Sequence, residues 1–220
     1  MLVITMAPAK PIAFGRTFLK EHRHVCAFFH SPREEYDTLI PFICDGLNCG
    51  ERALHVLPTR HMGDHEQRLR KAGVDVEAKT KSGQLAIATP EQTYMRTGKF
   101  DKEDMLNCIQ EALQEGKRLG FPLTRMIAHA ETAVTDWASG QAWVEYEMRL
   151  NAVLPNYDDT VICTYDANLL SGPLAIDILR THPVAIVGGV LYQNPFAAKS
   201  EDFLDELRQR SAQDHQAYRA

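Results

Sequence analysis

Residues 161–189, VICTYDANLLSGPLAIDILRTHPVAIVGG, decide the fold of this chain. Val161–Tyr165 and Val184–Val187 are short, mostly apolar runs rich in β-branched residues, and apolar residues recur at helical spacing between them. Pro173 stands near the first position of that helix, where its missing N–H costs nothing, and Pro183 ends it. The stretch therefore predicts strand, helix and strand. Strands that are apolar on both faces are typical of a parallel sheet covered by helices on both sides.

The same alternation of strand and helix patterns continues along the rest of the chain. Four further strands are expected, at His24–Phe29, Arg52–Leu57, Gln84–Ala88 and Thr124–Ala128. Helices are expected after Ser31, around Thr59–Ala72, and at Lys102–Leu119, Ser139–Val153 and Ser200–Arg210. This order predicts an α/β fold, a three-layer sandwich with a mostly parallel sheet of about six strands.

A chain of 220 residues fits one domain with a sizeable core. Residues 1–21 are expected to be an irregular N-terminal lead-in with one short helical turn near Thr17–Glu21. Residues 22–210 are expected to form the single α/β domain, and residues 211–220 a frayed tail.

The composition excludes several classes of function. A net charge of −5 gives no overall attraction to nucleic acid or to an anionic membrane. No apolar run reaches the roughly 18–20 residues that span a bilayer, and the N-terminus lacks the basic start of a signal peptide. The five cysteines are an odd number, which fits buried free thiols in a reducing compartment. We therefore expect a cytoplasmic protein that contacts neither a membrane nor nucleic acid directly.

The first strand–helix turn, FHSPREEY at residues 29–36, carries no phosphate-binding loop. A P-loop needs GxxxxGK[ST], whose glycines and lysine surround the phosphates, and this turn has neither residue type. Ser31 and Glu34 instead form a capping-box pattern, and the carboxylates of Glu34 and Glu35 would repel a triphosphate. GxGxxG and GxSxG motifs are also absent. These observations argue against nucleotide hydrolysis and against a dinucleotide site.

Ligands of such folds bind beyond the carboxyl ends of the strands, so the residues there are the candidates for a site. His129 and Glu131 follow the fourth strand and alternate along it, as an acid–base couple or two metal ligands would. The favoured interpretation is a histidine that a carboxylate holds in place, because spacing fixes no nucleophile or third ligand. Tyr94 and Tyr165, in a loop and at a strand end, are candidates to line an apolar pocket, with Tyr165 facing the same crevice as His129.

The remaining histidines receive structural interpretations. His61 and His65 lie four apart on a helix, which is metal spacing, but a solvated helix face is favoured. His24 is expected to be one of several chance surface histidines. His182 is expected to complement the dipole at the end of its helix.

Taken together, these stretches resemble the MEDS domain, the methanogen/methylotroph DcmR sensory family. The motifs that carry the resemblance are HVCAFFHSPREEYDTLIPF (24–42), AGVDVEAKTKSGQL (72–85), Tyr94 with GKFD (98–101), GFPLTRMIAHAE (120–131), VEYEMRLNAVLPNYDD (144–159) and IDILRTHPVAIVGGVLYQNPF (176–196). The resemblance covers about residues 22–210. It implies a RecA/KaiC-like fold that lacks the Walker A phosphate loop, and a sensor of small hydrocarbon derivatives.

The resulting hypothesis is a cytoplasmic sensory domain that binds a small, partly apolar molecule and signals through a partner protein or a homo-oligomer, without catalysis. No catalytic residue, metal ligand or cofactor is expected. The expected ligand-binding residues are His30, Tyr94, His129, Glu131 and Tyr165.

Two alternatives stay open. One is a protein-interaction or signalling adaptor with a vestigial pocket, whose exposed apolar patch would run along Phe203, Leu204 and Leu207. The other is an enzyme that uses His129 and Glu131 as an acid–base or metal pair.

Overall fold

A computed structural model describes residues 10–93, 95–130 and 137–217, and in 137–139 and 211–217 it describes the backbone alone. The strands are β1 (Ile12–Phe14), β2 (Thr17–Leu19), β3 (His24–Phe29), β4 (Arg52–Val56), β5 (Leu85–Ala88), β6 (Thr124–His129), β7 (Thr160–Asp166), β8 (Val184–Val187) and β9 (Val190–Gln193). The α-helices are α1 (Pro32–Asn48), α2 (Thr59–Lys71), α3 (Val76–Lys81), α4 (Lys102–Arg118), α6 (Trp137–Val153), α7 (Gly172–Thr181) and α8 (Ser200–Ala217). Short 3-10 helices occupy Pro90–Gln92 and Leu154–Asn156.

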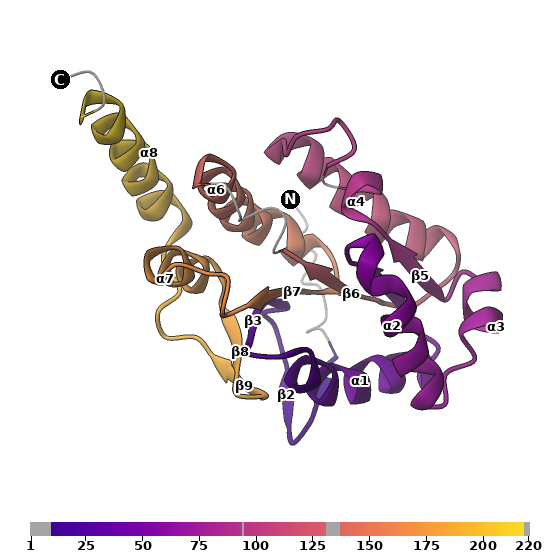
Figure 1. The fold of residues 1–220 in the computed structure, drawn as a ribbon. Helices are drawn as coiled ribbons and strands as arrows, with labels where there is room; N and C mark the ends of the chain where they lie inside the picture. Colours follow the sequence, from indigo (N-terminus) through magenta and orange to yellow (C-terminus); the bar gives the residue numbers. More distant parts are fainter. Residues whose placement is uncertain (1–9, 94, 131–136, 218–220) are drawn as a thin grey trace, which may run out of the picture.

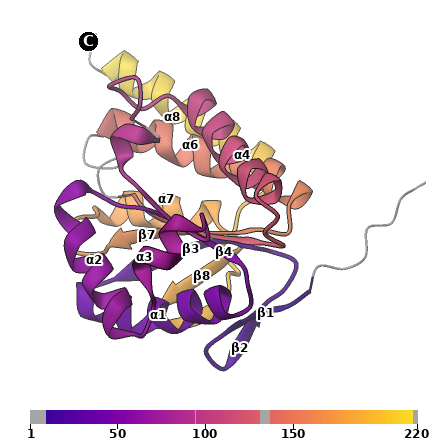
Figure 2. The ribbon, with the colours of Figure 1, turned by 90° about the vertical axis from the view of Figure 1, so that its right-hand side faces the viewer.

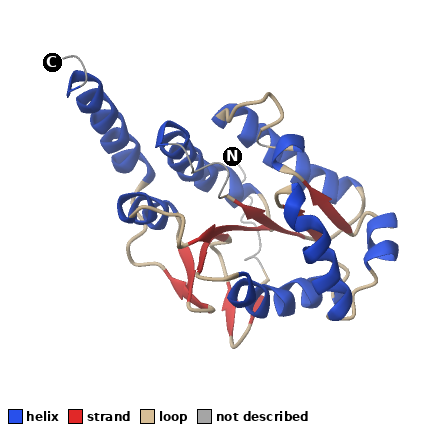
Figure 3. Ribbon diagram, in the orientation of Figure 1, coloured by secondary structure: helices blue, strands red, loops and turns tan. Residues whose placement is uncertain are grey.

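Seven of these strands form one sheet in the order β5-β4-β6-β7-β3-β8-β9 (Figures 1 and 3). Every neighbouring pair is parallel except β8 and β9, which run antiparallel. The mostly parallel α/β sheet predicted from the sequence is therefore confirmed. β3 lies between β7 and β8, so the first strand of the sheet is paired with strands from the far end of the chain.

The sheet is the middle of three layers (Figure 2). Helices α1, α2 and α3, with the β1–β2 hairpin, cover one face, and α4, α6, α7 and α8 cover the other. Side chains alternate along each strand, so β3 sends Val25 and Ala27 into the core under α1 and Cys26 into the core under α6. The central strands thus contribute to two separate apolar cores, which explains why their sequences are mostly apolar.

The turn between β3 and α1 is fixed by side-chain hydrogen bonds. Ser31 is the N-cap, and its hydroxyl accepts a hydrogen bond from the backbone N–H of Glu34 at 3.2 Å. The carboxylate of Glu34 accepts from the N–H of His30 at 2.8 Å, one residue before the partner that a capping box would use. The helix therefore begins where the sequence predicts, and it places Glu35 at the carboxyl ends of the strands.

The sheet has one strand more than the sequence pattern predicted. Gly188 and Gly189, both with positive φ, form a two-residue turn in which Val187 pairs with Val190. Two glycines in this conformation suit a tight hairpin, because the turn twists in the same sense as the strands. The glycine pair therefore leads into β9 as well as ending β8.

The expected irregular lead-in with a helical turn near residues 17–21 is wrong. β1 and β2 form an antiparallel hairpin that turns at Gly15, where φ is +56°. The hairpin buries its own apolar side chains, Ile12, Phe14 and Leu19, in the core beneath α1, and this burial outweighs the weak local helix signal.

At the other end of the chain, α8 continues to Ala217, beyond the expected end at Arg210. Among the described residues, none of the helices combines the length and apolarity that crossing a bilayer requires.

Candidate functional site

A cavity of about 130 Å³ opens at the carboxyl ends of the central strands, and we call it the His129 cavity. The strand ends contribute Phe29, His129, Thr164, Tyr165 and Asp166. The starts of α1 and α2 contribute Ser31, Pro32, Glu35, Tyr36, His61 and Asp64. The chain leaves β3 for α1 and returns at β4, with β6 and β7 between these two strands, so the cavity lies at the point where the strand order changes direction. This is where open α/β sheets bind their ligands.

His129 is held in the cavity wall by a carboxylate. Its Nε2 lies 3.2 Å from Oε1 of Glu35, and both side chains are largely buried. Glu131, the carboxylate that the sequence paired with His129, lies outside the described residues, as does Tyr94. The carboxylate partner of His129 is thus Glu35, for which the sequence suggests only the repulsion of phosphate.

A chain of buried polar side chains lies behind the same wall. The hydroxyl of Tyr36 lies 2.9 Å from Nδ1 of His65, and Nε2 of His65 lies 2.8 Å from Nδ1 of His55. His65 is only 4% exposed, so the expected solvated helix face is wrong at this position. Burial, with a further contribution from His129, lowers the pKa of His65 to about 4. Burial and the neighbouring His65 lower the pKa of His55 well below its ordinary value, so both rings are neutral near pH 7.

The lining of the cavity is apolar on one side and rich in hydrogen-bonding groups on the other. Phe29 and Pro32 supply apolar surface, while Glu35, Asp64 and Asp166 bring three carboxylates to the same small space. Such a lining suits a small molecule with an apolar part and a hydrogen-bond donor or positive charge. It disfavours phosphate, because the carboxylates would face a second anion.

Tyr165 and His129 both line the cavity, but the hydroxyl of Tyr165 is engaged elsewhere. That hydroxyl donates to Oε1 of Glu147 at 2.7 Å and accepts from Nε1 of Trp143 at 2.8 Å. The register explains the difference: His129 pairs with Thr164, so the next side chain along β7 points to the opposite face of the sheet. The phenol of Tyr165 therefore belongs to the core under α6.

His30, the remaining predicted ligand-binding residue, is exposed and is absent from the lining of the His129 cavity. Its backbone is used by the turn: the N–H donates to Glu34, and the carbonyl accepts from Asn168 at 2.9 Å. The structure therefore brings His129 and Tyr165 to one cavity and places His30 beside it.

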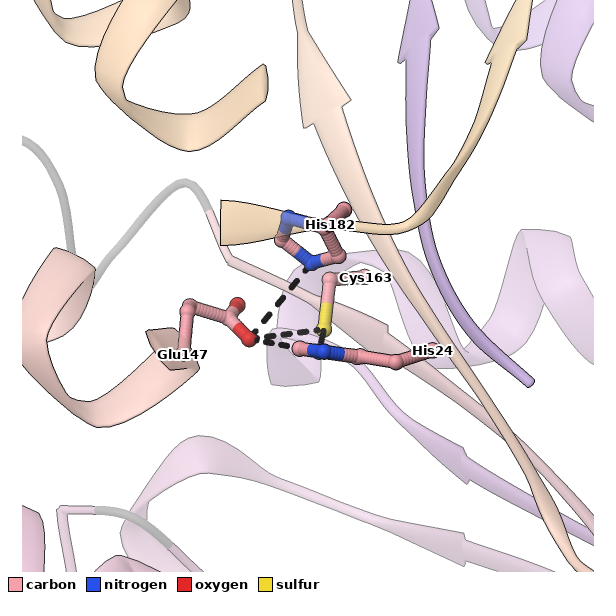
Figure 4. Close-up of side chains that lie close together, drawn as sticks. All are labelled: His24, Glu147, Cys163 and His182. Atoms are coloured by element: carbon pink, nitrogen blue, oxygen red, sulfur yellow. Dashed lines mark hydrogen bonds and ion pairs between the residues drawn. The ribbon is translucent and has the colours of Figure 1, made fainter. Parts of the chain in front are cut away.

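A second group of polar side chains is buried on the opposite face of the sheet, and we call it the Glu147 cluster (Figure 4). It consists of His24, Glu147, Cys163 and His182. Oε2 of Glu147 lies 2.8 Å from Nε2 of His24, 3.5 Å from Nε2 of His182 and 3.6 Å from Sγ of Cys163. Among the described residues, this is the group whose donor atoms could hold a metal ion.

Sequence reasoning missed this cluster. His24 was expected to be a surface residue, but it is 2% exposed, and His182 at the end of α7 is fully buried. Both residues come close to Glu147 because β3 pairs with β7 and with β8, contacts that join residues more than a hundred positions apart. The local signal that could have found them is the polar residue in an otherwise apolar strand, His24 in HVCAFF.

The profile of MEDS, the methanogen/methylotroph, DcmR sensory domain, matches residues 23–183. Among solved structures, a KaiC-like protein from the hyperthermophilic archaeon Pyrococcus horikoshii OT3 has a similar fold, with a TM-score of 0.53 and 18% sequence identity. That match covers 76% of this chain and 70% of the other. A comparison with curated proteins gave no match. At this identity the structural likeness concerns the fold alone, and it confirms the expected KaiC-like architecture.

Proposed function

The chain belongs to the MEDS family of sensory domains, and from that premise we propose that it binds a small, partly apolar molecule in the His129 cavity and passes the signal to a partner. The observation that carries the proposal is the cavity itself, at the edge of the sheet where α/β folds bind ligands. His129 and Glu35 supply the hydrogen-bonding groups, and Phe29 and Pro32 supply the apolar surface.

The size of the cavity supports a ligand of few atoms. A cavity of about 150 Å³ in another protein holds benzene, and the His129 cavity measures about 130 Å³. A molecule of that size with one polar group, such as a short-chain alcohol, amine or halogenated hydrocarbon, fits both the volume and the lining. This is the hydrocarbon-derivative class that the family resemblance implies.

We further propose that the phosphate-binding function of the fold has been lost here. The turn from β3 to α1 contains no glycine and no lysine, and Ser31 uses its hydroxyl to cap α1. Glu35 and Asp64 occupy the wall that a nucleotide phosphate would face. We expect that ATP does not raise the melting temperature of the protein and that the protein does not hydrolyse ATP. ATP hydrolysis that depends on residues 30–35 would contradict the proposal.

Absence of catalysis is part of the same proposal. Among the described lining residues there is no cysteine or lysine, and the hydroxyl of the one serine, Ser31, is engaged in the helix cap. His129 faces Glu35, which suits a histidine held for hydrogen bonding. The enzymatic alternative would use this pair as an acid–base couple. It would be favoured if the wild-type protein converted a metabolite and the variant His129→Ala did not.

For signalling, the exposed hairpin at the edge of the sheet is the proposed surface. Val187, Val190 and Tyr192 are each about half exposed on β8 and β9, and Phe196 is 66% exposed just beyond them. An edge strand with apolar side chains is a common place for strand pairing or partner binding. The expectation of an exposed apolar patch on α8 is wrong, because Phe203 and Leu207 are buried in the core under α6.

The decisive experiment is a thermal-shift screen of the full chain against small alcohols, amines, ketones and halogenated hydrocarbons. A ligand at a hundred times its Kd adds about 2.7 kcal/mol of stability. The shift should be absent in His129→Ala and retained in His30→Ala, because His30 is exposed and absent from the cavity lining. A panel that produces no shift, or an equal shift in His129→Ala, would refute this assignment of the site.

A further inference from the structure

The Glu147 cluster brings four potential metal-ligand atoms together in a dry part of the protein. His24 comes from β3, Glu147 from α6, Cys163 from β7 and His182 from the end of α7. Their exposed fractions lie between 0 and 2%. The donor atoms all lie within 4.8 Å of one another, and they face a common point (Figure 4).

The orientation of His182 is fixed by its other ring nitrogen. Nδ1 of His182 lies 2.9 Å from the carbonyl oxygen of Ile178, so Nδ1 must carry a proton and donate it. In the neutral ring Nε2 then has a free lone pair. Nε2 is buried, has no hydrogen-bond partner among the described residues, and faces Oε2 of Glu147 at 3.5 Å.

His24 is oriented in the same way. Its Nδ1 lies 2.9 Å from Oδ1 of Asn151, and the amide of Asn151 is itself fixed because Nδ2 donates to the carbonyl of Thr181 at 2.6 Å. Nδ1 of His24 is therefore the donor, and Nε2 faces Glu147 at 2.8 Å. Histidines that bind metals are held in this manner, with the second ring nitrogen donating to a carbonyl or amide oxygen.

Two imidazole nitrogens, a thiol and a carboxylate thus converge on one point. The thiol of Cys163 donates to Oε2 of Glu147, whereas the contact of that oxygen with Nε2 of His24 needs a proton or a metal cation between the two atoms. The separations suit a metal ion. Tetrahedral zinc, with bonds of 2.0–2.3 Å, keeps its ligand atoms about 3.3–3.8 Å apart. The contacts of Glu147 with His182 and Cys163, at 3.5 and 3.6 Å, agree with this range. The contact of Glu147 with His24, at 2.8 Å, would have to open by about half an ångström. The wider separations, 3.9 Å between His24 and Cys163 and up to 4.8 Å within the group, would have to close.

We propose that His24, Glu147, Cys163 and His182 form a closed, structural binding site for one divalent transition-metal ion, with zinc as the best match. One sulfur, two nitrogens and one oxygen are a ligand set that zinc accepts, whereas calcium and magnesium select oxygen alone. On binding, the thiol of Cys163 releases its proton to solvent and Sγ bonds to the ion. The thiolate and the Glu147 carboxylate then balance the two positive charges, so the buried site is neutral.

The surrounding residues support this assignment. Tyr165 donates to Oε1 of Glu147 and so leaves Oε2 for the ion. Metal binding displaces the proton of the Cys163 thiol, because the thiolate is the form that bonds to the ion.

The test is metal binding by the full chain, measured directly. Purified wild-type protein should contain equimolar zinc by elemental analysis. The zinc-free protein should bind equimolar Co²⁺ with the near-ultraviolet charge-transfer band of a cobalt thiolate. Cys163→Ser should remove that band and weaken zinc binding at least about tenfold. Asn151→Ala, which removes the acceptor of His24, should weaken it about 10- to 100-fold.

Cys26→Ser is the matched control. Cys26 is as buried as Cys163 and is its register partner across β3 and β7, but its thiol is directed to the carbonyl of Val184 at 3.7 Å. This variant should keep the cobalt band and the zinc affinity. If Cys163→Ser does not fold, the wild-type cobalt spectrum decides. Wild-type protein that binds neither ion, or cobalt bound without the thiolate band, would overturn the proposal and leave a shared proton between His24 and Glu147.

Discussion

The buried histidine chain behind the cavity should make the protein sensitive to mild acid. In the unfolded chain His65 has an ordinary pKa near 6.5, and in the folded protein its pKa is about 4. Between these values the unfolded state binds a proton that the folded state does not, so stability is present above pH 6.5 and is lost as the pH falls towards 4. For this one residue, lowering the pH from 7.5 to 5 costs about 2 kcal/mol of unfolding free energy.

The assay is urea unfolding at a series of pH values, on wild type and on His65→Gln. Glutamine keeps a hydrogen-bonding side chain beside Tyr36 and His55 but does not titrate. Groups that titrate in both proteins cancel in the comparison. The pH dependence of His65→Gln between 7.5 and 5 should therefore be smaller than that of wild type by about 2 kcal/mol. His30→Gln, at an exposed site, should follow wild type. Equal pH dependence in wild type and His65→Gln would refute the burial argument.

Three further predictions concern packing and capping, and each is measured by urea unfolding at neutral pH. Gly46→Ala would place Cβ 2.6 Å from Nε of the buried Arg125, and it should lower the free energy of unfolding by about 1–3 kcal/mol. The control is Gly63→Ala, in an open part of α2, which should raise the free energy of unfolding by up to about 1 kcal/mol. Equal effects of the two substitutions would contradict the close contact at Gly46. Ser31→Ala should lower the free energy of unfolding by about 1 kcal/mol, because it removes the N-cap of α1. An unchanged urea midpoint would mean that the cap does not stabilise the protein. Phe203→Ala, at a site 1% exposed, should cost about 3–5 kcal/mol, and a loss below about 1 kcal/mol would show that α8 is not anchored there.

Local patterns were sufficient to predict the parallel sheet and, apart from the end of α8, the main helices around it. The unit at Val161–Gly189 forms β7, α7 and β8 as expected, because its two strands and its prolines are specified by neighbouring residues. The hairpin at Gly188 and Gly189 was missed although its signal was present in the sequence. The positive φ angles of two glycines lead back into a strand as readily as into a loop.

The polar interior could not be predicted in the same way. His65 lies on a strongly polar helix, and its burial depends on Tyr36 and His55, which belong to other elements. The Glu147 cluster requires the order of strands in the sheet, which periodicity does not contain. Of the predicted ligand-binding residues, His129 and Tyr165 line one cavity. Their polar groups lie on opposite faces of the sheet, and this can be predicted only when the register of β6 and β7 is known.

The position of β3 in the sheet also bears on how the chain folds during synthesis. Both neighbours of β3 belong to the last third of the chain, since β7 begins at Thr160 and β8 at Val184. Until those residues leave the ribosome, the apolar strand His24–Phe29 has unpaired edges on both sides. Such long-range pairing slows folding and exposes strand edges to aggregation. Nascent chains that stop before β7 should therefore depend on a chaperone to keep the first strand of the sheet from pairing with another molecule.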